Sequence, residues 1–437
     1  MSHSQVTPDV TIPSAKQTTL PRLLVIGNGM AGVRTVEEVL KLCPDKYQIT
    51  IIGAENQVNY NRIMLSPILA GEKQVKDIVL NSEAWYLENN IELIAGDSAT
   101  HIHRTRKIVT TESGRQVPYD KLILATGSRP NIIPFPGHQL NNVLGFRTLE
   151  DVGKMLAASK THTNAVVIGG GLLGLEAASG LKRQGMQVTV IHSSAFLLNR
   201  QIDPNAANLL QQALHNEGVE FAMSARTEKL IGNDEGRVVA VELKDGTRIP
   251  ADLVIFATGV KPNMELAQSA GIYCEHGILV NDTMQTFDPA IYAVGECVQH
   301  RGELFGLVAP LFQQAKVCAN HLAELGYSRY QQTPVATKLK VTGIDVYSAG
   351  EFLASEANDE FDIITFEDVD KAIYKKLVIK NNVLVGAVLF GDIVDGAFYF
   401  DLIQENADIT NYRNLLMFGK AFCQPTASEE PVPVQAA

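Results

Sequence analysis

Two glycine-rich turns at the ends of short apolar runs constrain the fold more than any other feature of this sequence. Residues 24–32 read LVIGNGMAG, and residues 166–176 read VVIGGGLLGLE. In each turn three glycines have the spacing G-x-G-x-x-G, where an apolar run passes into a helix-like stretch. The first glycine allows a tight bend, the second lets the backbone approach a pyrophosphate, and the third lets helix and strand pack closely. The two turns therefore predict two dinucleotide sites.

The segments around the two turns follow one repeating βαβ pattern. The elements that we predict there are a strand at 22–26, a helix from Met30 to Leu42 and a strand at 48–52, then a strand at 165–168, a helix at 174–184 and a strand at 187–192. Two further strands run into Ala-Thr-Gly turns, in residues 120–130 and 251–262. This order indicates an α/β fold class with two Rossmann-like, doubly wound domains.

The sequence after about Val335 is of a different kind. Its apolar runs suggest antiparallel strands, and Lys380-Asn381-Asn382 would form a hairpin turn. We therefore expect a small C-terminal α+β domain. The predicted organisation is a flexible arm at 1–20, a first dinucleotide-binding domain from 21–142 and 260–330, a second at 143–259, the C-terminal domain at 335–423 and a flexible tail at 424–437.

The overall charge and the cysteines exclude several classes of protein. The 437 residues carry a formal net charge of −11, which disfavours binding to nucleic acid or to an anionic membrane surface. No apolar run approaches the roughly 20 residues of a membrane-spanning helix, and the N-terminus lacks the features of a secretory signal. The five cysteines are scattered, without the spacing of a metal site. We expect reduced thiols, no metal site and a cytoplasmic location.

The turns and the strand ends beside them supply candidate cofactor-binding residues. Glu55 is the acid nearest the end of the second strand, where a carboxylate would hold a ribose; the alternative is an exposed loop acid. His192 takes that place in the second unit, where the missing carboxylate would not repel a 2′-phosphate. Ser193, Ser194 and Arg200 could then serve NADPH, although the histidine is equally well explained as a polar strand end. The turn residues are Gly27, Asn28, Gly29, Met30, Ala31 and Gly32 in the first unit, and Gly169, Gly171, Leu172, Leu173 and Gly174 in the second.

Two acids and the start of one helix are candidates for residues that lie near the reacting ends of such cofactors. Glu176 lies in an otherwise apolar helix start, so that we expect it to face the cleft; the alternative is a surface helical acid. Residues 291–296 read IYAVGE, and Glu296 could accept hydrogen bonds from a polyol chain. Pro310 suits the first turn of the next helix. The N-terminus of that helix would favour negative charge, as on a reduced flavin ring.

The two turns, the two Ala-Thr-Gly turns and the Gly-Glu strand end together resemble the two-dinucleotide flavoprotein reductases over roughly residues 21–330. These enzymes bind FAD in one domain and NAD(P)H in an inserted second one. Residues 58–72, 291–319 and 337–351 are similar to the flavin-bearing N-terminal half of the large subunit of assimilatory NAD(P)H nitrite reductases. The resemblance implies FAD on the first turn and NAD(P)H on the second.

The resemblance also implies roles for single residues. Glu176 would be the catalytic residue beside the nicotinamide. Rubredoxin-type reductases carry a lysine after a Leu-Ser pair, whereas here Pro67 follows Ser66, which argues against a Lys–Glu pair. The other implied cofactor-binding residues are Asn61 and Arg62 at the nucleotide end of FAD, Thr126 and Gly127 near its pyrophosphate, Gly295 and Glu296 at its ribityl hydroxyls, and Thr258 and Gly259 in the second domain.

The function that follows from the resemblance is an FAD-dependent NAD(P)H oxidoreductase that passes electrons to a separate protein. The leading hypothesis is the electron-transfer subunit of an assimilatory nitrate or nitrite reductase system, whose catalytic subunit would be the partner. The alternatives are a stand-alone rubredoxin or ferredoxin reductase and a flavin-bound redox sensor. The five cysteines cannot supply a clustered iron–sulfur ligand set, so we expect no nitrite reduction by the chain itself.

Three further expectations concern surfaces and the thiols. Cys297, beside Glu296, is expected to be a core thiol. The acidic runs at 359–362 and 367–370 are candidate docking acids for the acceptor, and the alternative is a solvated face. A homodimer is compatible with the resemblance.

Overall fold

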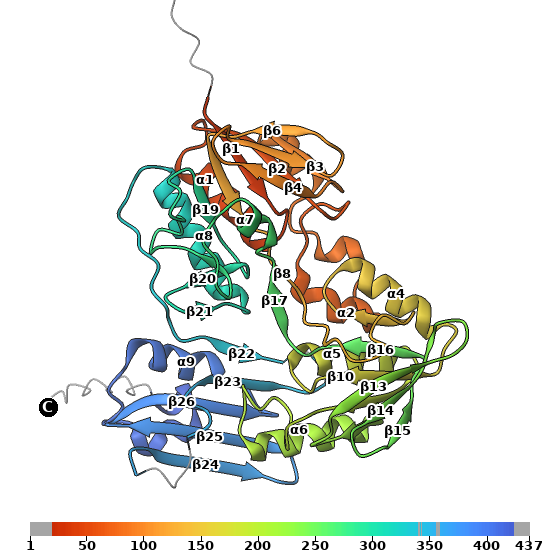
Figure 1. Cartoon of the computed structure of the whole chain (residues 1–437). Helices are drawn as coiled ribbons and strands as arrows, with labels where there is room; N and C mark the ends of the chain where they lie inside the picture. The colour runs from red at the N-terminus through yellow and green to blue at the C-terminus, as the bar shows by residue number, and fades with distance from the viewer. Residues whose placement is uncertain (1–19, 340, 342, 355–358, 424–437) are drawn as a thin grey trace, which may run out of the picture.

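The structure, a computed structural model, describes residues 20–339, 341, 343–354 and 359–423. Figure 1 shows three parts: one at the top, a second at the lower right and a third, made by the C-terminal residues, at the lower left. The predicted arm, apart from Leu20, and the predicted tail lie outside the described residues. None of the described helices is both long and apolar enough to cross a membrane.

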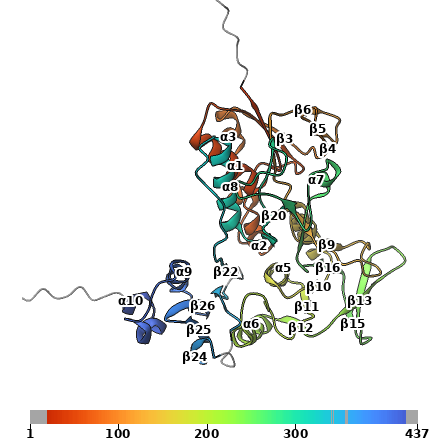
Figure 2. The same cartoon turned by 60° about the vertical axis from the view of Figure 1, so that its left-hand side comes forward.

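A five-stranded parallel sheet forms the core of the first domain, at the top of Figure 1. Its central strand, β1 (Arg22–Ile26), is almost wholly buried, as expected for a strand covered on both faces. Helices α1 (Met30–Leu42) and α8 (Val308–Leu322) lie side by side (Figure 2). Across the sheet the strands are β19 (Ile291–Ala293), β7 (Lys121–Leu124), β1, β2 (Gln48–Gly53) and β3 (Ile91–Ala95).

The first domain also contains several smaller elements. They are α3 (Glu83–Glu88), the antiparallel sheet of β4 (Ala99–His103), β5 (Ile108–Thr111) and β6 (Gln116–Pro118), helix α7 (Glu265–Ser269), and the sheet of β18 (Ile278–Leu279), β20 (Val298–His300) and β21 (Glu303–Leu304).

The second domain repeats the parallel arrangement. Helix α5 (Leu172–Arg183) begins two residues before the predicted 174, because Gly171 occupies the N-cap. The short helix α2 (Leu65–Leu69) comes from the first part of the chain but packs on α5. Across the parallel sheet the strands are β12 (Val219–Ala222), β11 (Gln187–Ile191), β10 (Asn164–Ile168), β16 (Leu253–Phe256) and β9 (Val143–Gly145). The other elements are α4 (Leu149–Ser159), α6 (Pro204–Asn216), the antiparallel sheet of β13 (Thr227–Gly232), β14 (Val238–Leu243) and β15 (Arg248–Pro250), and the 3₁₀ turns η1 (Arg62–Met64) and η2 (Val75–Ile78).

Two antiparallel strands join the two domains. The chain leaves the first domain through β8 (Ser128–Pro130) and returns through β17 (Val260–Pro262). Each strand directly follows one of the Ala-Thr-Gly turns. The turns therefore lie where the chain crosses between the two parallel sheets.

The C-terminal domain is built on a five-stranded antiparallel sheet. The predicted hairpin at 380–382 is confirmed: Asn381 and Asn382 have φ values of 52° and 58°, as a tight two-residue turn requires. The domain lies beside α6 (Figure 2) and shares a hydrophobic cluster with the second domain. The elements are β22 (Ala336–Lys338), β23 (Val346–Gly350), β26 (Val383–Phe390), β25 (Ile373–Lys380) and β24 (Asp362–Asp368) across the sheet, then α9 (Gly396–Glu405), η3 (Arg413–Phe418) and α10 (Lys420–Cys423). The predicted fold class is confirmed.

Candidate functional site

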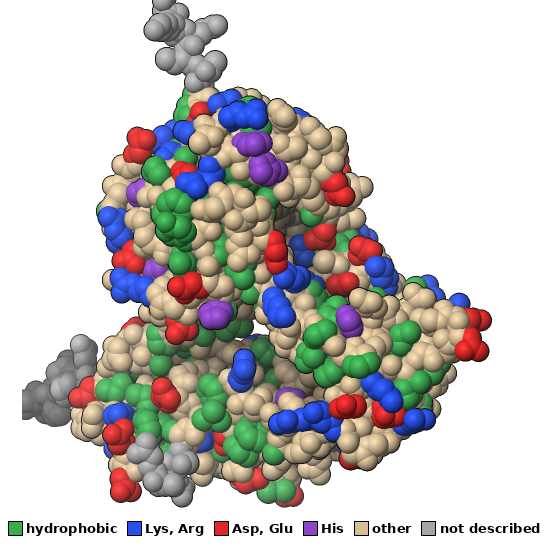
Figure 3. Space-filling view, viewed as in Figure 1, with side chains coloured by type: hydrophobic (Ala, Val, Ile, Leu, Met, Phe, Trp, Pro, Cys, Tyr) green, Lys and Arg blue, Asp and Glu red, His purple; other side chains and the backbone are tan. Residues whose placement is uncertain are grey.

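One cavity of about 1540 Å³ runs along both glycine-rich turns. The turns lie at the carboxyl ends of β1 and β10, where open parallel sheets bind their ligands. Figure 3 shows the surface hollowed between the upper domain and the two lower ones. Both glycine-rich turns therefore open into one cavity.

The first turn has the geometry of a pyrophosphate cradle. Gly27 has a φ of +119°, and a Cβ there would lie 2.1 Å from the carbonyl oxygen of Ala125. A Cβ on Gly32 would lie 2.4 Å from the oxygen of Gly27, so both positions need glycine. A Cβ on Gly29 would meet nothing within 4 Å, which leaves open space at the start of α1. Asn28 supports the turn, since its Oδ1 accepts a hydrogen bond of 2.8 Å from the Tyr86 hydroxyl.

The second turn repeats this geometry closely. Gly169 has a φ of +124°, and its Cβ would lie 2.3 Å from the oxygen of Ala257. A Cβ on Gly174 would lie 1.9 Å from the oxygen of Gly169, whereas one on Gly171 would meet nothing. Both turns thus leave space in front of a helix N-terminus, whose free N–H groups bind phosphate.

Most of the predicted residues come together on the cavity wall. Gly32 and Gly174 lie behind the turns as packing positions. Asn61 does not line the cavity; its Oδ1 accepts a hydrogen bond of 3.1 Å from the Ile63 N–H and caps η1. The predicted residues on the wall are Gly27, Asn28, Gly29, Met30, Ala31, Glu55, Arg62, Thr126, Gly127, Gly169, Gly171, Leu172, Leu173, Glu176, His192, Arg200, Thr258, Gly259, Gly295 and Glu296.

Glu55 is held by two partners on the first side of the cavity. It forms an ion pair with Arg62, and the Tyr60 hydroxyl donates a hydrogen bond of 2.7 Å to its second oxygen. The Arg62 guanidinium lies over the Tyr60 ring, 5.0 Å from its centroid. Glu55, for which an exposed loop acid was the alternative, is 30% exposed and belongs to a charged cluster on the cavity wall.

Glu296 is paired with a residue that the sequence analysis did not identify. Arg147, between β9 and α4, forms an ion pair with Glu296, and the Ser128 hydroxyl donates a hydrogen bond of 2.7 Å to the same carboxylate. The side chains of Arg147 and Glu296 are 19% and 11% exposed, so this pair is largely withdrawn from water. The sequence near Arg147 gave one weak indication of its role: the arginine directly precedes the capping box of α4, which Thr148 and Asp151 form.

Glu176 faces the cavity, as predicted, and is 7% exposed. The Ser66 hydroxyl, at the start of α2, donates a hydrogen bond of 2.5 Å to its Oε2. Ser66 comes from the first part of the chain and Glu176 from the second domain. The contact therefore joins the two cofactor regions at a buried carboxylate.

His192 directly follows β11, which ends at Ile191, one residue before the predicted end at 192. The Gly170 N–H donates a hydrogen bond of 3.1 Å to its Nδ1, which places the ring proton on Nε2. Burial lowers the pKa of His192 below its ordinary value. Its Nε2 is buried and has no hydrogen-bond partner among the described residues.

The two Ala-Thr-Gly turns hold the crossover strands together. The Thr126 hydroxyl donates a hydrogen bond of 2.6 Å to the Asn263 carbonyl, and the Thr258 hydroxyl donates one of 2.5 Å to the Asn131 carbonyl. Both hydroxyl hydrogens are therefore donated within the protein, and both threonines still line the cavity. The glycines after them, Gly127 and Gly259, have positive φ and line the cavity.

The helix start and the thiol lie as predicted. Pro310 is in the first turn of α8, and Leu307 and Val308, at the N-terminus of that helix, line the cavity. Cys297 is fully buried, and burial raises the pKa of its thiol. None of the five cysteines lines the cavity, and the described residues contain no cluster of metal ligands.

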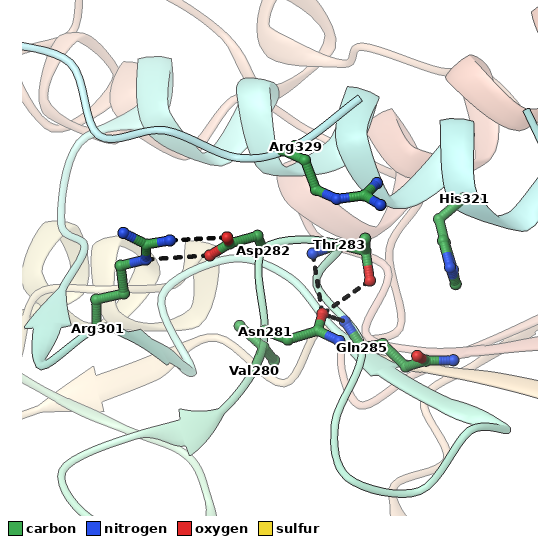
Figure 4. A pocket seen from close by; sticks show the side chains of 8 residues that line it. All are labelled: Val280, Asn281, Asp282, Thr283, Gln285, Arg301, His321 and Arg329. Carbon is green, nitrogen blue, oxygen red and sulfur yellow. Dashed lines mark hydrogen bonds and ion pairs between the residues drawn. The ribbon is translucent and has the colours of Figure 1, made fainter. Parts of the chain in front are cut away.

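A second hollow, of about 500 Å³, lies in the first domain (Figure 4). Its carboxylate, Asp282, is already paired with Arg301 at 2.7 Å and with His300 at 2.9 Å. No glycine-rich turn borders it. The large cavity is therefore the candidate site.

Comparison with known proteins agrees with this geometry. Residues 21–338 match the pyridine nucleotide-disulphide oxidoreductase family, and residues 334–407 match the rubredoxin NAD+ reductase C-terminal domain. The chain is 47% identical over 416 residues to nitrite reductase (NAD(P)H) of Bacillus subtilis (strain 168), covering 95% of this chain and 50% of that protein. It is 44% identical over 389 residues to the assimilatory nitrate reductase electron transfer subunit of the same organism, covering 89% of this chain and 50% of that one.

A solved structure is also similar over nearly its whole length. The covalent putidaredoxin reductase–putidaredoxin complex matches with a TM-score of 0.80 and 28% identity, covering 91% of this chain and 95% of that one. The chain spans about half the length of the two curated relatives described above. The chain belongs to the pyridine nucleotide-disulphide oxidoreductase family, whose members are FAD-dependent NAD(P)H oxidoreductases, and it carries the C-terminal domain of the rubredoxin reductases.

Proposed function

We propose that this chain passes electrons from NAD(P)H, through FAD, to a separate acceptor protein, as the electron-transfer part of an assimilatory nitrate or nitrite reductase system. The observation that carries the proposal is the single cavity lined by both cradles, with the buried Glu176 on its wall. Similarity to an electron transfer subunit supports the assignment of the partner. The solved complex of putidaredoxin reductase with putidaredoxin supports the need for a separate acceptor.

The first cradle and the charged residues near it suit FAD. When bound, the nicotinamide supplies a hydride, and the flavin accepts it and releases electrons one at a time. The N-terminus of α1 would hold the pyrophosphate. Arg62 and Arg147 place two positive charges on this side of the cavity. Glu296 would exchange its contact with Arg147 for hydrogen bonds from ribityl hydroxyls.

The second cradle and α5 suit the nicotinamide nucleotide. Ser66 fixes the rotamer of Glu176, so that the carboxylate can orient the ring without loss of freedom at the moment of reaction. The N-terminus of α8, which lines the same cavity, would favour a negative charge close to that helix end. Since no cysteine lines the cavity, the proposed reaction uses no thiol of this chain.

A stand-alone rubredoxin or ferredoxin reductase is the second candidate. The match of residues 334–407 to the rubredoxin NAD+ reductase C-terminal domain favours it. A flavin-bound sensor is less well supported, because a sensor needs no second cradle. The cytoplasmic location and the homodimer stay predictions.

The test is reduction and reoxidation of the flavin in the purified full chain. We expect a bound flavin that NADH or NADPH bleaches within seconds under anaerobic conditions. A nitrate or nitrite reductase catalytic subunit should then reoxidise it faster than rubredoxin or ferredoxin does. Faster reoxidation by rubredoxin would favour the second candidate. A flavin that neither nucleotide reduces would contradict both.

A further inference from the structure

The wall of the cavity beyond the second cradle carries cations and no carboxylate. Its lining residues within 191–201 and 225–244 include Arg200, Arg226 and Lys244. The five acids that line the cavity, Glu55, Glu150, Asp151, Glu176 and Glu296, all lie outside these two segments. A ligand in this part of the cavity would meet positive charge alone.

Backbone hydrogen bonds bring the cation-bearing segments to the end of β11. The Ala225 N–H donates to the His192 carbonyl at 2.9 Å, and the Ser224 N–H donates to the Ser194 carbonyl at 3.1 Å. The Lys244 N–H donates to the Arg226 carbonyl at 2.9 Å. Arg226 and Lys244 therefore stand together beside the strand end where a dinucleotide places its adenosine ribose.

Among the described residues, the three cations have no partner of opposite charge. No ion pair joins Arg200, Arg226 or Lys244 to a carboxylate in the part of the chain that the structure describes. Other cations of the same domain are paired, for example Lys229 and Arg248, which share Glu242. Unpaired cations grouped on a cavity wall favour an anionic ligand.

The residue at the strand end removes the usual obstacle to such an anion. NAD-binding domains use a carboxylate here to accept a hydrogen bond from the ribose 2′-hydroxyl. His192 accepts the Gly170 N–H at its Nδ1 and, since burial lowers its pKa, brings no negative charge to this strand end. A carboxylate at this place would repel a 2′-phosphate, and here none is present.

We infer that the second cradle selects NADPH over NADH, with Arg226 and Lys244 as the principal residues that bind the 2′-phosphate and Arg200 as a further cation. The inference rests on the proposed function, because it names which nucleotide the second cradle takes. It extends the candidate set to Arg226 and Lys244, which lie 34 and 52 positions beyond the strand end. The sequence analysis did not identify these two residues, because they are far from His192 in the sequence.

Binding of two small fragments tests the inference without any flavin reaction. Adenosine 2′,5′-bisphosphate differs from 5′-AMP only by the 2′-phosphate, and calorimetry measures both dissociation constants on the full chain. We expect the bisphosphate to bind at least tenfold more tightly. Arg226→Ala and Lys244→Ala should each weaken the bisphosphate roughly tenfold to hundredfold and leave 5′-AMP unchanged. Arg237→Ala, an exposed arginine of the same domain outside the cavity, should change neither constant.

A reversed substitution gives an independent test. His192→Asp keeps an acceptor for the Gly170 N–H but introduces a carboxylate beside the ribose. We expect it to remove the preference for the bisphosphate and to shift kcat/KM from NADPH toward NADH. Equal dissociation constants of the two fragments for the unsubstituted chain would overturn the inference. So would an Arg226→Ala variant that loses affinity for the bisphosphate and for 5′-AMP by the same factor. Flavin reduction by NADH alone would overturn it and leave the proposed function standing, whereas reduction by neither nucleotide would remove the function itself.

Discussion

At the scale of single residues, the ion pair between Arg147 and Glu296 connects the two domains inside the cavity. The two residues are 149 positions apart, and their side chains are mostly buried. Removal of the arginine leaves a carboxylate without its partner in a region that water reaches poorly, which costs more than loss of an exposed pair. Glu296 is proposed to bind the ribityl hydroxyls of FAD, and Arg147 lines the same side of the cavity.

Arg147→Ala should therefore weaken both the fold and FAD binding. We expect the free energy of unfolding of the apoprotein to fall by about 1–3 kcal/mol. The dissociation constant of FAD should rise roughly tenfold, as measured by flavin fluorescence. Arg115→Ala is the matched control, because Arg115 pairs with Glu92 where both side chains are 49% exposed, and its loss should cost less than about 1 kcal/mol. Equal effects of the two substitutions would mean that burial of the Arg147 pair is unimportant.

Glu176→Gln tests the carboxylate that stands between the two cofactor regions. Glutamine has nearly the same shape, and its amide oxygen can still accept the hydrogen bond from Ser66. FAD affinity should stay within twofold, while flavin reduction by the nicotinamide nucleotide slows roughly tenfold to hundredfold. Stopped-flow bleaching of the flavin measures the rate. An unchanged rate would assign Glu176 a purely structural role.

The sequence predicted residues whose role depends on their neighbours in the chain. It did not predict contacts between residues that are far apart in the chain. The glycines of the two cradles follow from local sterics, which their spacing reveals. Arg147 was missed because its partner is remote in sequence. Thr126 lies on the cavity wall, as expected, but the bond of its hydroxyl to Asn263 could not be predicted, because only the crossover of the chain creates it.

At the scale of elements, the crossover pair β8 and β17 sets how the two domains meet. Thr126→Val removes the hydroxyl that ties this crossover and keeps the side-chain volume. We expect the free energy of unfolding, measured with urea, to fall by about 0.5–1.5 kcal/mol. FAD affinity should stay within twofold, because the hydroxyl is turned to the protein. A tenfold loss of FAD affinity would instead mean that the Thr126 hydroxyl contacts the cofactor.

The elements themselves follow closely from the sequence. Helix α1 has the predicted bounds, because Gly29 caps its start and an apolar face runs along its length. The acidic runs were harder to interpret. They border β24, the edge strand on the opposite side of the sheet from β22, whose Ala336 and Lys338 line the cavity. Asp362 pairs with Arg413, and Glu360 pairs with Lys380. Charged side chains protect an edge strand from further pairing, so a solvated face explains these acids better than docking beside the flavin.

At the scale of the whole molecule, the C-terminal domain is anchored to the second domain through a buried polar cluster. The Tyr374 hydroxyl donates a hydrogen bond of 2.8 Å to Asp203, the N-cap of α6. Lys376 lies 3.8 Å from the same carboxylate and donates to the carbonyls of Phe352 and Ala354. Tyr374, Asp203 and Lys376 are all less than 9% exposed. The sequence could not predict this docking, because its partners are more than 170 positions apart.

Tyr374→Phe should therefore loosen the docking of the two domains without unfolding either. Loss of a hydrogen bond to a charged group costs about 1.5–3 kcal/mol, so local opening should become roughly tenfold to hundredfold more frequent. Hydrogen exchange should accelerate at the start of α6, at the amides of Ala206 and Ala207. Tyr399→Phe is the control, because that hydroxyl donates to the Leu416 carbonyl within the C-terminal domain. It should speed exchange around α9 and leave α6 protected. If both substitutions accelerate hydrogen exchange in α6, the C-terminal domain opens as one unit with α6. The bond from Tyr374 to Asp203 would then not be what holds the two domains together.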